Sequence, residues 1–176
     1  MSKQAELNIN LGDYRMFRIT GGLTSKSQVD AVRIADMTKL IDADLRESLW
    51  GSLEVLSKVY NQTNAPSLSD AVNELGTVGS GEILVNKQIE LVIKVADYQS
   101  VRLQAGLSVA VDPKEVSKAQ KLMGKVLLAD LIHSLWFTKT MSPNQAAKEE
   151  YTKACGAKVE ARMAKLNAQK QGQAQQ

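Results

Sequence analysis

The stretch GDYRMFRITGGLT, residues 12–24, decides the fold because a second version of it, ADYQSVRLQAGLS, follows 84 positions later at residues 96–108. Eight of 20 positions are identical across the window that contains these stretches. Further on, ADLRESLW at residues 43–50 shares six of its eight residues with ADLIHSLW at residues 129–136. Two matches in the same order indicate an internal repeat. We predict that the second half of the chain is a diverged copy of the first.

Both copies open on an alternation of apolar and other residues, which covers residues 7–11 in the first copy. A period of two is typical of a β-strand with one buried face. A three-residue loop at residues 12–14 would place Phe17 opposite Ile9 and keep the apolar side chains on one face. The sequence therefore favours a β-hairpin in each copy. The alternative is a single long strand bent at a bulge, which would also keep the apolar side chains on one face.

The apolar period then changes to that of a helix. In the second copy Asp112 is a typical N-cap, Pro113 suits the first helical position, and apolar residues follow at helical spacing as far as Leu135. The first copy repeats this pattern from about Ser27 to Tyr60. Each unit is thus predicted to be ββα. We expect an α+β fold in which the duplicated ββα units form a four-stranded antiparallel sheet with two long helices on one face, plus a C-terminal helix.

The repeats also set the expected boundaries. Residues 1–141 are predicted to form a single compact body, made of two repeats (5–60 and 89–141) and a linker with a short helix (61–88). A basic C-terminal helix is expected over residues 142–168. The tail, residues 169–176, has nothing apolar to bury and is expected to be disordered.

Composition is that of a folded protein, with 44% hydrophobic and 23% charged residues. No apolar run approaches the roughly 20 residues that cross a bilayer, and the first ten residues lack the apolar core of a signal peptide. We therefore expect a cytoplasmic protein that does not enter a membrane. The net charge of +3 lies entirely in residues 142–176, which carry six basic and three acidic side chains. Attraction to phosphate is therefore expected of the C-terminal segment alone.

No catalytic set is apparent, and we expect neither an enzyme nor a cofactor. The single histidine, His133, is interpreted as a surface residue, and the single cysteine, Cys155, as a packed small residue. Asp44 and Asp130 hold equivalent positions in the two copies and could hold a metal ion. Each flanks the leucine stripe of its helix by roughly 100°, so a solvated edge is favoured and no metal site is predicted. The glycines of GTVGSGE, residues 76–82, are interpreted as a connector, because no strand precedes them and no GK[ST] follows.

Trp50 and Trp136 point well away from the leucine stripes of the two long helices. Two interpretations are open. Packing of the other helices, the C-terminal one included, would cover both indoles. Alternatively, the two tryptophans form an interface with a second copy or another protein, since Trp is enriched among interface anchors.

A candidate nucleic-acid site comprises Tyr14 and Arg18 with their counterparts Tyr98 and Arg102, together with Lys94. On the hairpin model the arginines lie on the sheet face opposite the core, with the tyrosines at the turns. Open sheets with aromatic and arginine side chains bind single-stranded nucleic acid by stacking on bases and contacting phosphates. We therefore expect binding of single-stranded nucleic acid with little sequence preference, aided by the basic C-terminal segment.

Two alternatives compete with this expectation. The arginines could simply form cross-strand ion pairs, Arg18 with Glu6 and Arg102 with Glu90, on a solvated face. The protein would then be a structural or assembly subunit that oligomerises through its long helices.

Overall fold

The computed structural model describes residues 2–26, 31–59, 65–138 and 142–173. The strands are β1 (Ser2–Gly12), β2 (Arg15–Ser25), β3 (Ile83–Ala96) and β4 (Gln99–Val111). The helices are α1 (Ala31–Val59), α2 (Leu68–Leu75), α3 (Val116–Ile132) and α4 (Gln145–Gln173). A 3₁₀ turn, Pro113–Glu115, precedes α3, and a π-helical turn, His133–Phe137, follows it.

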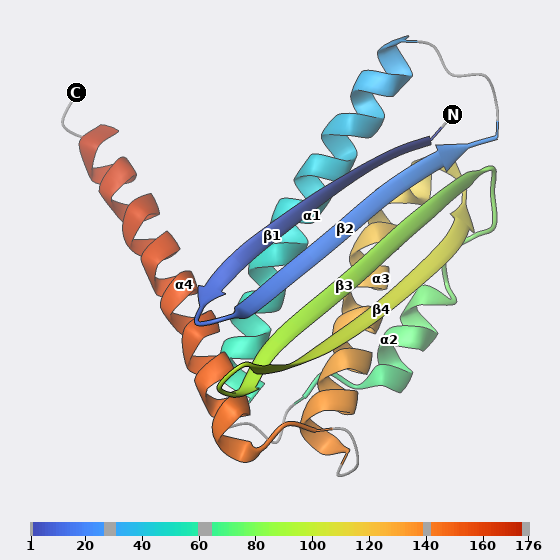
Figure 1. Cartoon of the computed structure of the whole chain (residues 1–176). Helices are drawn as coiled ribbons and strands as arrows, with labels where there is room; N and C mark the ends of the chain where they lie inside the picture. The colour runs from blue at the N-terminus through green and yellow to red at the C-terminus, as the bar shows by residue number, and fades with distance from the viewer. Residues whose placement is uncertain (1, 27–30, 60–64, 139–141, 174–176) are drawn as a thin grey trace.

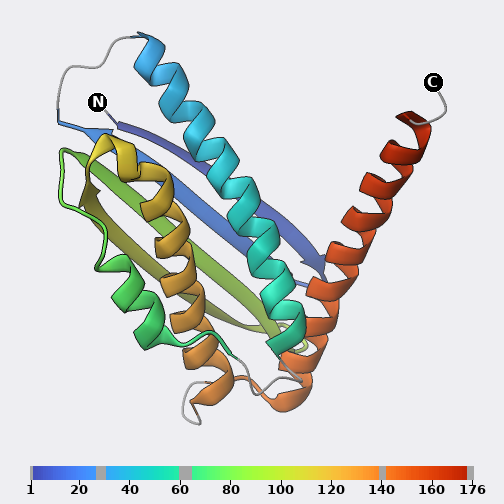
Figure 2. The ribbon, with the colours of Figure 1, turned by 180° about the vertical axis from the view of Figure 1, so that it is seen from behind.

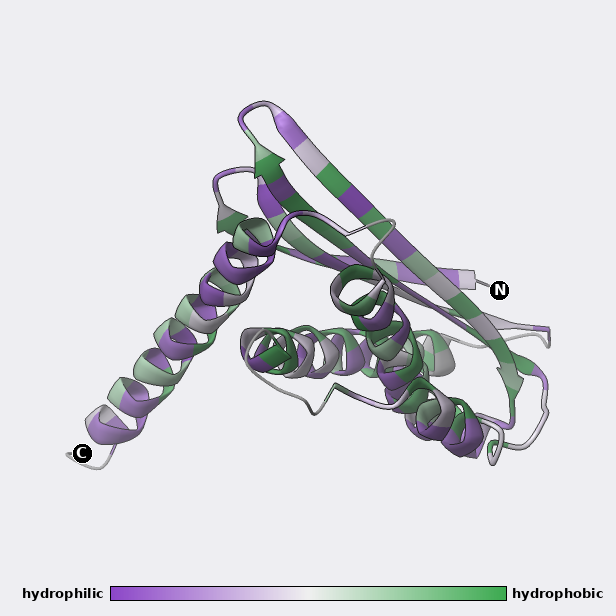
Figure 3. Cartoon of the chain, turned by 90° about the horizontal axis from the view of Figure 1, so that it is seen from below, coloured by the Kyte–Doolittle hydropathy of each residue, from purple (hydrophilic) through white to green (hydrophobic). Residues whose placement is uncertain are grey.

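The fold is α+β, with one antiparallel sheet in the order β1-β2-β3-β4. Helices α1 and α3 lie side by side against one face of this sheet, and no helix of the described residues covers its other face (Figures 1 and 2). Seen along the layers in Figure 3, the sheet lies above α1 and α3 while α4 leads away from both. No helix within the described ranges is long and apolar enough to span a membrane.

The predicted hairpin is confirmed, with Ile9 opposite Phe17 and Leu7 opposite Ile19. Its loop is shorter than predicted, because Gly12 already pairs with Arg15. A shift in register between Asn10 and Gly12 compensates for the missing loop residue. Gly12 has a φ of +88°, which glycine adopts without strain.

The second hairpin closes in the same manner, with Ala96 opposite Gln99 and a register shift between Lys94 and Ala96. These positions correspond to those of the first hairpin at the 84-residue offset. The four-stranded sheet and the helices on one face are thus as predicted. The internal duplication itself stays a prediction.

The core fills the space between the sheet and the two helices. Apolar residues of the predicted stripes are fully buried there, among them Ile41, Leu45, Met123 and Leu127. Asp112, the predicted N-cap, caps the 3₁₀ turn that leads into α3 and not α3 itself: its carboxylate accepts a hydrogen bond from the Lys114 backbone N–H at 2.9 Å. Residues 27–30, 60 and 139–141, which fall inside the predicted repeats, lie outside the described residues.

Two boundaries differ from the sequence-based ones. Strand β3 begins at Ile83 rather than near residue 89, so part of the expected linker is strand. Helix α4 continues to Gln173, past the expected end at residue 168. Residues 174–176 of the expected tail lie outside the described ranges.

Helix α4 joins the body through its first half. Ala147, Tyr151 and Cys155 are buried, and the Tyr151 hydroxyl donates a hydrogen bond to the Met16 carbonyl at 3.1 Å. Burial raises the pKa of the Cys155 thiol to about 12, so the thiol stays protonated and unreactive. The last part, residues 163–173, is exposed throughout, and we call it the arm.

Candidate functional site

The arginines of the predicted nucleic-acid site lie on the uncovered sheet face and are paired with glutamates. Arg18 Nε lies 3.4 Å from Glu6 Oε1, and its Nη1 lies 3.5 Å from Glu90 Oε2. Arg102 Nε lies 2.9 Å from Glu90 Oε1. The Glu90 side chain is only 4% exposed, because a cation lies on each side of it. The cross-strand pairs of the alternative interpretation are therefore present.

The middle of this face is polar and uncharged. Thr20, Gln88 and Gly106 follow one another across three strands, and the next row comprises Gly22, Asn86 and Ser108. A shallow hollow lies over the two glycines. These rows offer amides and hydroxyls but no free cation to a phosphate.

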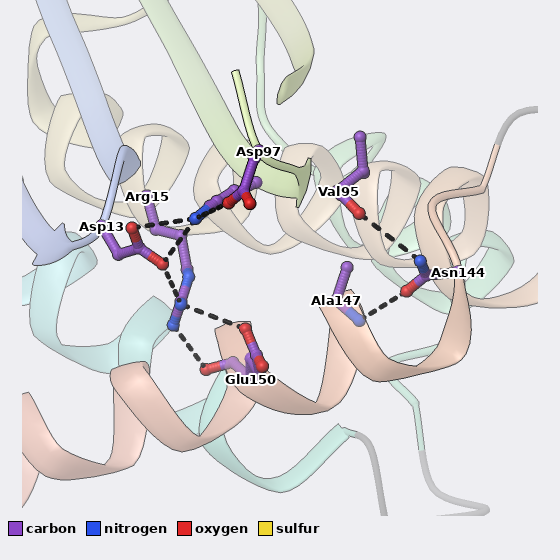
Figure 4. Close-up of polar contacts among 8 residues, drawn as sticks. Asp13, Arg15, Val95, Asp97, Asn144, Ala147 and Glu150 are labelled. Carbon is purple, nitrogen blue, oxygen red and sulfur yellow. Dashed lines mark hydrogen bonds and ion pairs between the residues drawn. The ribbon is translucent and has the colours of Figure 1, made fainter. Parts of the chain in front are cut away.

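Lys94 belongs to an ion cluster at the hairpin tips, which Figure 4 shows. Its Nζ lies 3.0 Å from Asp97 Oδ1 and 3.1 Å from Asp13 Oδ1, so it bridges the two hairpins. Hydrogen bonds to Asp97 and Asp13 raise the pKa of Lys94. The hydrogen bond between Lys94 and Asp13 also lowers the pKa of the Asp13 carboxyl. Arg15 Nη2 lies 3.0 Å from Asp13 Oδ2 and 3.1 Å from Glu150 Oε2, which ties the first hairpin to α4.

Asn144 connects the second hairpin to the start of α4 (Figure 4). Its side-chain amide donates to the Val95 carbonyl at 3.4 Å, and its Oδ1 accepts from the Ala147 backbone N–H at 2.8 Å. The second contact is that of an N-cap. Both hairpins and α4 are thus held together at one end of the sheet.

The predicted tyrosines project from this end. Tyr14 is 77% exposed and Tyr98 fully exposed. Their φ angles, 59° and 61°, lie in the left-handed region that is uncommon for residues other than glycine. The structure brings the two tyrosines to the same end of the sheet as Lys94.

Helix α4 packs over both tryptophans, as the first of the two interpretations expects. The Arg162 guanidinium lies 4.4 Å from the centre of the Trp50 ring. Trp136 meets Tyr151 edge to face, with 6.4 Å between the ring centres. Both indoles stay partly exposed, so their role as an interface remains a prediction.

The expectation of a solvated Asp44 is wrong. Asp44 is buried between α1 and β3, where its Oδ2 lies 2.8 Å from Lys87 Nζ. The Lys87 ammonium also donates to Ser48 Oγ at 2.8 Å and to the Gln120 carbonyl at 2.7 Å. Desolvation lowers the pKa of Lys87, while the carboxylate of Asp44 opposes that shift. A side chain at Gly124 would approach Lys87 Nζ to 3.2 Å, which accounts for a glycine in mid-helix.

Across the described ranges no three His, Cys, Asp or Glu side chains gather as metal ligands would. His133 is exposed and stacks near Phe137. In the glycine connector the Gly79 N–H already donates to the Glu115 carboxylate at 2.7 Å.

An apolar pocket that sequence reasoning missed lies at the other end of the molecule, between the first turns of α1 and α3 and the adjoining sheet end. Its apolar lining is contributed by Leu23, Met37, Leu40, Ile83, Pro113 and Val116. Two carboxylates, Asp36 and Glu82, also line it. The sequence indicates this pocket only through Val32, Asp36 and Leu40, whose four-residue spacing places them on one face of α1, beside its buried leucine stripe.

Comparisons with known proteins give no further guide: no family model, curated protein or solved structure matches this chain.

Proposed function

We propose that this protein is a structural or assembly subunit whose copies associate through α4. The observation that supports this proposal is the apolar stripe of α4. The stripe is buried against the body at Ala147, Tyr151 and Cys155, and it continues onto the arm, where Met163 is 51% and Leu166 38% exposed. The eleven exposed residues of the arm extend beyond the body, so packing against their own chain contributes little to the stability of this part of the helix. Contact with a partner would bury its apolar side.

The charges on the sheet favour assembly over nucleic-acid binding. Arg18, Arg102 and Lys94 each contact at least one carboxylate. A phosphate chain would have to compete with Glu90, Asp13 and Asp97 for these cations. Nucleic-acid affinity depends mainly on cations that are free to replace counterions on phosphates.

The test is the mass of the protein in solution as its concentration rises, measured by sedimentation velocity. We expect the full chain to associate and a chain that ends at Arg162 to stay monomeric. A chain that ends at Lys170 is the matched control, since it keeps both apolar residues of the arm, and it should behave as the full chain does. A full chain that stays monomeric at every concentration would refute the proposal.

Binding of single-stranded nucleic acid is the second candidate, and the exposed tyrosines favour it. Two aromatic rings held at one end of the sheet could stack on successive bases, with attraction from Lys158, Lys165 and Lys170 of α4. In that case replacing Tyr14 and Tyr98 by alanine should weaken oligonucleotide binding by about tenfold or more. Absence of binding to a fluorescent oligonucleotide at low salt would exclude this candidate.

The internal duplication belongs to the same proposal. Its support is the matching closure of the two hairpins and the matching position of α1 and α3 after them. Two ββα halves that fail to superpose in an experimental structure would contradict it.

A further inference from the structure

The arm and the apolar pocket are complementary in chemistry. On the arm, Met163, Leu166 and Lys170 share one face of the helix, with about 10 Å along the axis from Met163 to Lys170. At the pocket, exposed apolar groups of Val32 and Leu40 adjoin the carboxylates of Asp36 and Glu82. Each surface thus has an apolar centre and charge of a single sign.

Among the described residues, these charges have no ion-pair partner. Within the described part of the chain, no ion pair involves Asp36 or Glu82 at the pocket. The arm carries Lys165 and Lys170 and no acidic residue, and neither lysine forms an ion pair with a described residue. Lys39 and Lys114 lie close to the pocket in sequence but do not line it.

We propose that the arm of one copy docks in the pocket of a second copy, with Met163 and Leu166 against the apolar lining and Lys170 toward Asp36 and Glu82. This inference rests on the proposed assembly function and names the two surfaces that carry it. Opposite charges around an apolar centre give such an interface its orientation and its choice of partner.

Pairing of two arms is less favourable. The charged side chains of each arm are all cations, so two paired arms would bring lysines together with no carboxylate to offset them. Like charges placed together at an interface oppose association. The pocket supplies the missing carboxylates, and it also supplies the cavity that two helices lack.

The interface is heterologous, because two different surfaces of the chain meet in it. Each copy retains a free arm or a free pocket for the next copy, so the assembly grows into a ring or an open row. A symmetric pair formed through one self-complementary surface would stop at two copies.

Complementary variants test this arrangement. The arm variant carries Met163→Gln and Leu166→Gln, which remove the apolar groups without adding a charge that could attract an altered pocket, and the pocket variant carries Asp36→Lys and Leu40→Lys. All four positions lie at or near the surface, and thermal melts of each variant alone will show whether it folds. Val72→Lys is the control, since Val72 is an exposed apolar residue of α2 that belongs to neither surface.

Sedimentation of each variant alone should give monomers at concentrations where the unaltered chain associates, with affinity weakened by about tenfold or more. An equimolar mixture of the two should form a complex of two chains and nothing larger, because only one intact arm and one intact pocket can meet. The control should associate normally. If the unaltered chain associates but the mixture stays monomeric, or either variant alone associates normally, the docking proposal is wrong while the assembly function stands. A monomeric unaltered chain would overturn both.

Discussion

The two faces of β3 use the same kind of contact, a cation against a carboxylate, in opposite surroundings. On the covered face Lys87 meets Asp44 with side chains that are 1% and 7% exposed. At the uncovered end Lys94 meets Asp97, which is 87% exposed. The two pairs have nearly equal N–O distances, 2.8 and 3.0 Å. The difference in burial, and not the geometry, decides what each pair does for stability.

The buried pair is not a simple source of stability. Removing two charges from water costs several kcal/mol per ion, and their attraction roughly offsets that cost only while both are present. The exposed pair costs little to form and contributes little. One strand therefore carries one pair that must stay intact and another that is close to optional.

The largest effect is expected for Asp44→Ala, which leaves the Lys87 ammonium buried without its counter-charge. We expect a loss of about 3–5 kcal/mol in the free energy of unfolding, measured by urea titration. Asp42→Ala is the control, since Asp42 is exposed on the same helix, and should stay within about 0.5 kcal/mol of the unaltered chain. Adding Lys87→Met to the Asp44 variant should recover much of the loss. Equal losses for Asp44→Ala and Asp42→Ala would show that burial of the Asp44–Lys87 pair does not set its contribution to stability.

The pH dependence of an Asp44→Asn variant sharpens the same point. Desolvation already holds the pKa of Lys87 below its ordinary value of 10.5, and removal of the Asp44 charge should lower it further. Between the lowered pKa and 10.5 the unfolded chain binds the proton more tightly, so this group's contribution to stability rises with pH. The deficit of the variant relative to the unaltered chain should therefore shrink as the pH is raised toward 10.5. A deficit that is constant or grows over that range in parallel urea titrations would contradict this cause.

An intermediate effect is expected for Glu90, which lies on the uncovered face but is buried between two arginines. Glu90→Ala should lower the free energy of unfolding by about 1 kcal/mol, since Arg18 and Arg102 can turn toward water. Glu6→Ala removes an exposed partner of Arg18 and serves as the control, with a smaller loss in the same urea titration. A loss for Glu90→Ala as large as that for Asp44→Ala would show that ion pairs on the two faces of the sheet contribute equally to stability.

The smallest effect is expected for Lys94→Ala. Lys94 has exposed partners and solvent access, so the midpoint of urea unfolding should move little at low salt. At about 1 M salt, where screening acts over roughly 3 Å, any difference from the unaltered chain should vanish. A difference that persists at high salt would mean that the tip cluster acts through packing.

The strands, their register and the helical stripes could be predicted because each depends on the local spacing of apolar residues, with a period of two in the strands and of about 3.6 in the helices. The ion pair of Asp44 could not, since the linker was expected to reach residue 88 and Lys87 was counted in it. Extending the alternation backward from Ile93 through Ile89 to Val85 would have placed Lys87 on the covered face. Gly124, a glycine in the middle of a helix, was the second signal that a side chain comes close there.

The candidate site was predictable in its positions but not in its pairing. Tyr14 and Tyr98 lie at the turns, and Arg18 and Arg102 lie on the uncovered face, as the hairpin pattern predicts. Whether an arginine is free or paired depends on the neighbouring strand, and alternation along one strand carries no information on that choice. The pocket depends on residues from β2, α1, β3 and α3, so no single stretch of sequence indicates it.

The contact between Tyr151 and Met16 has a consequence for how the chain is made. It joins residues 135 positions apart, and Arg15 meets Glu150 over the same interval. During synthesis the first hairpin leaves the ribosome long before its α4 partner exists, and closing so long a loop is slow. The sheet and its two helices can therefore form while the end of the β1–β2 hairpin is still uncovered. Completion of α4 covers that end of the hairpin, so a chain released before residue 145 would lack the support of its first turn.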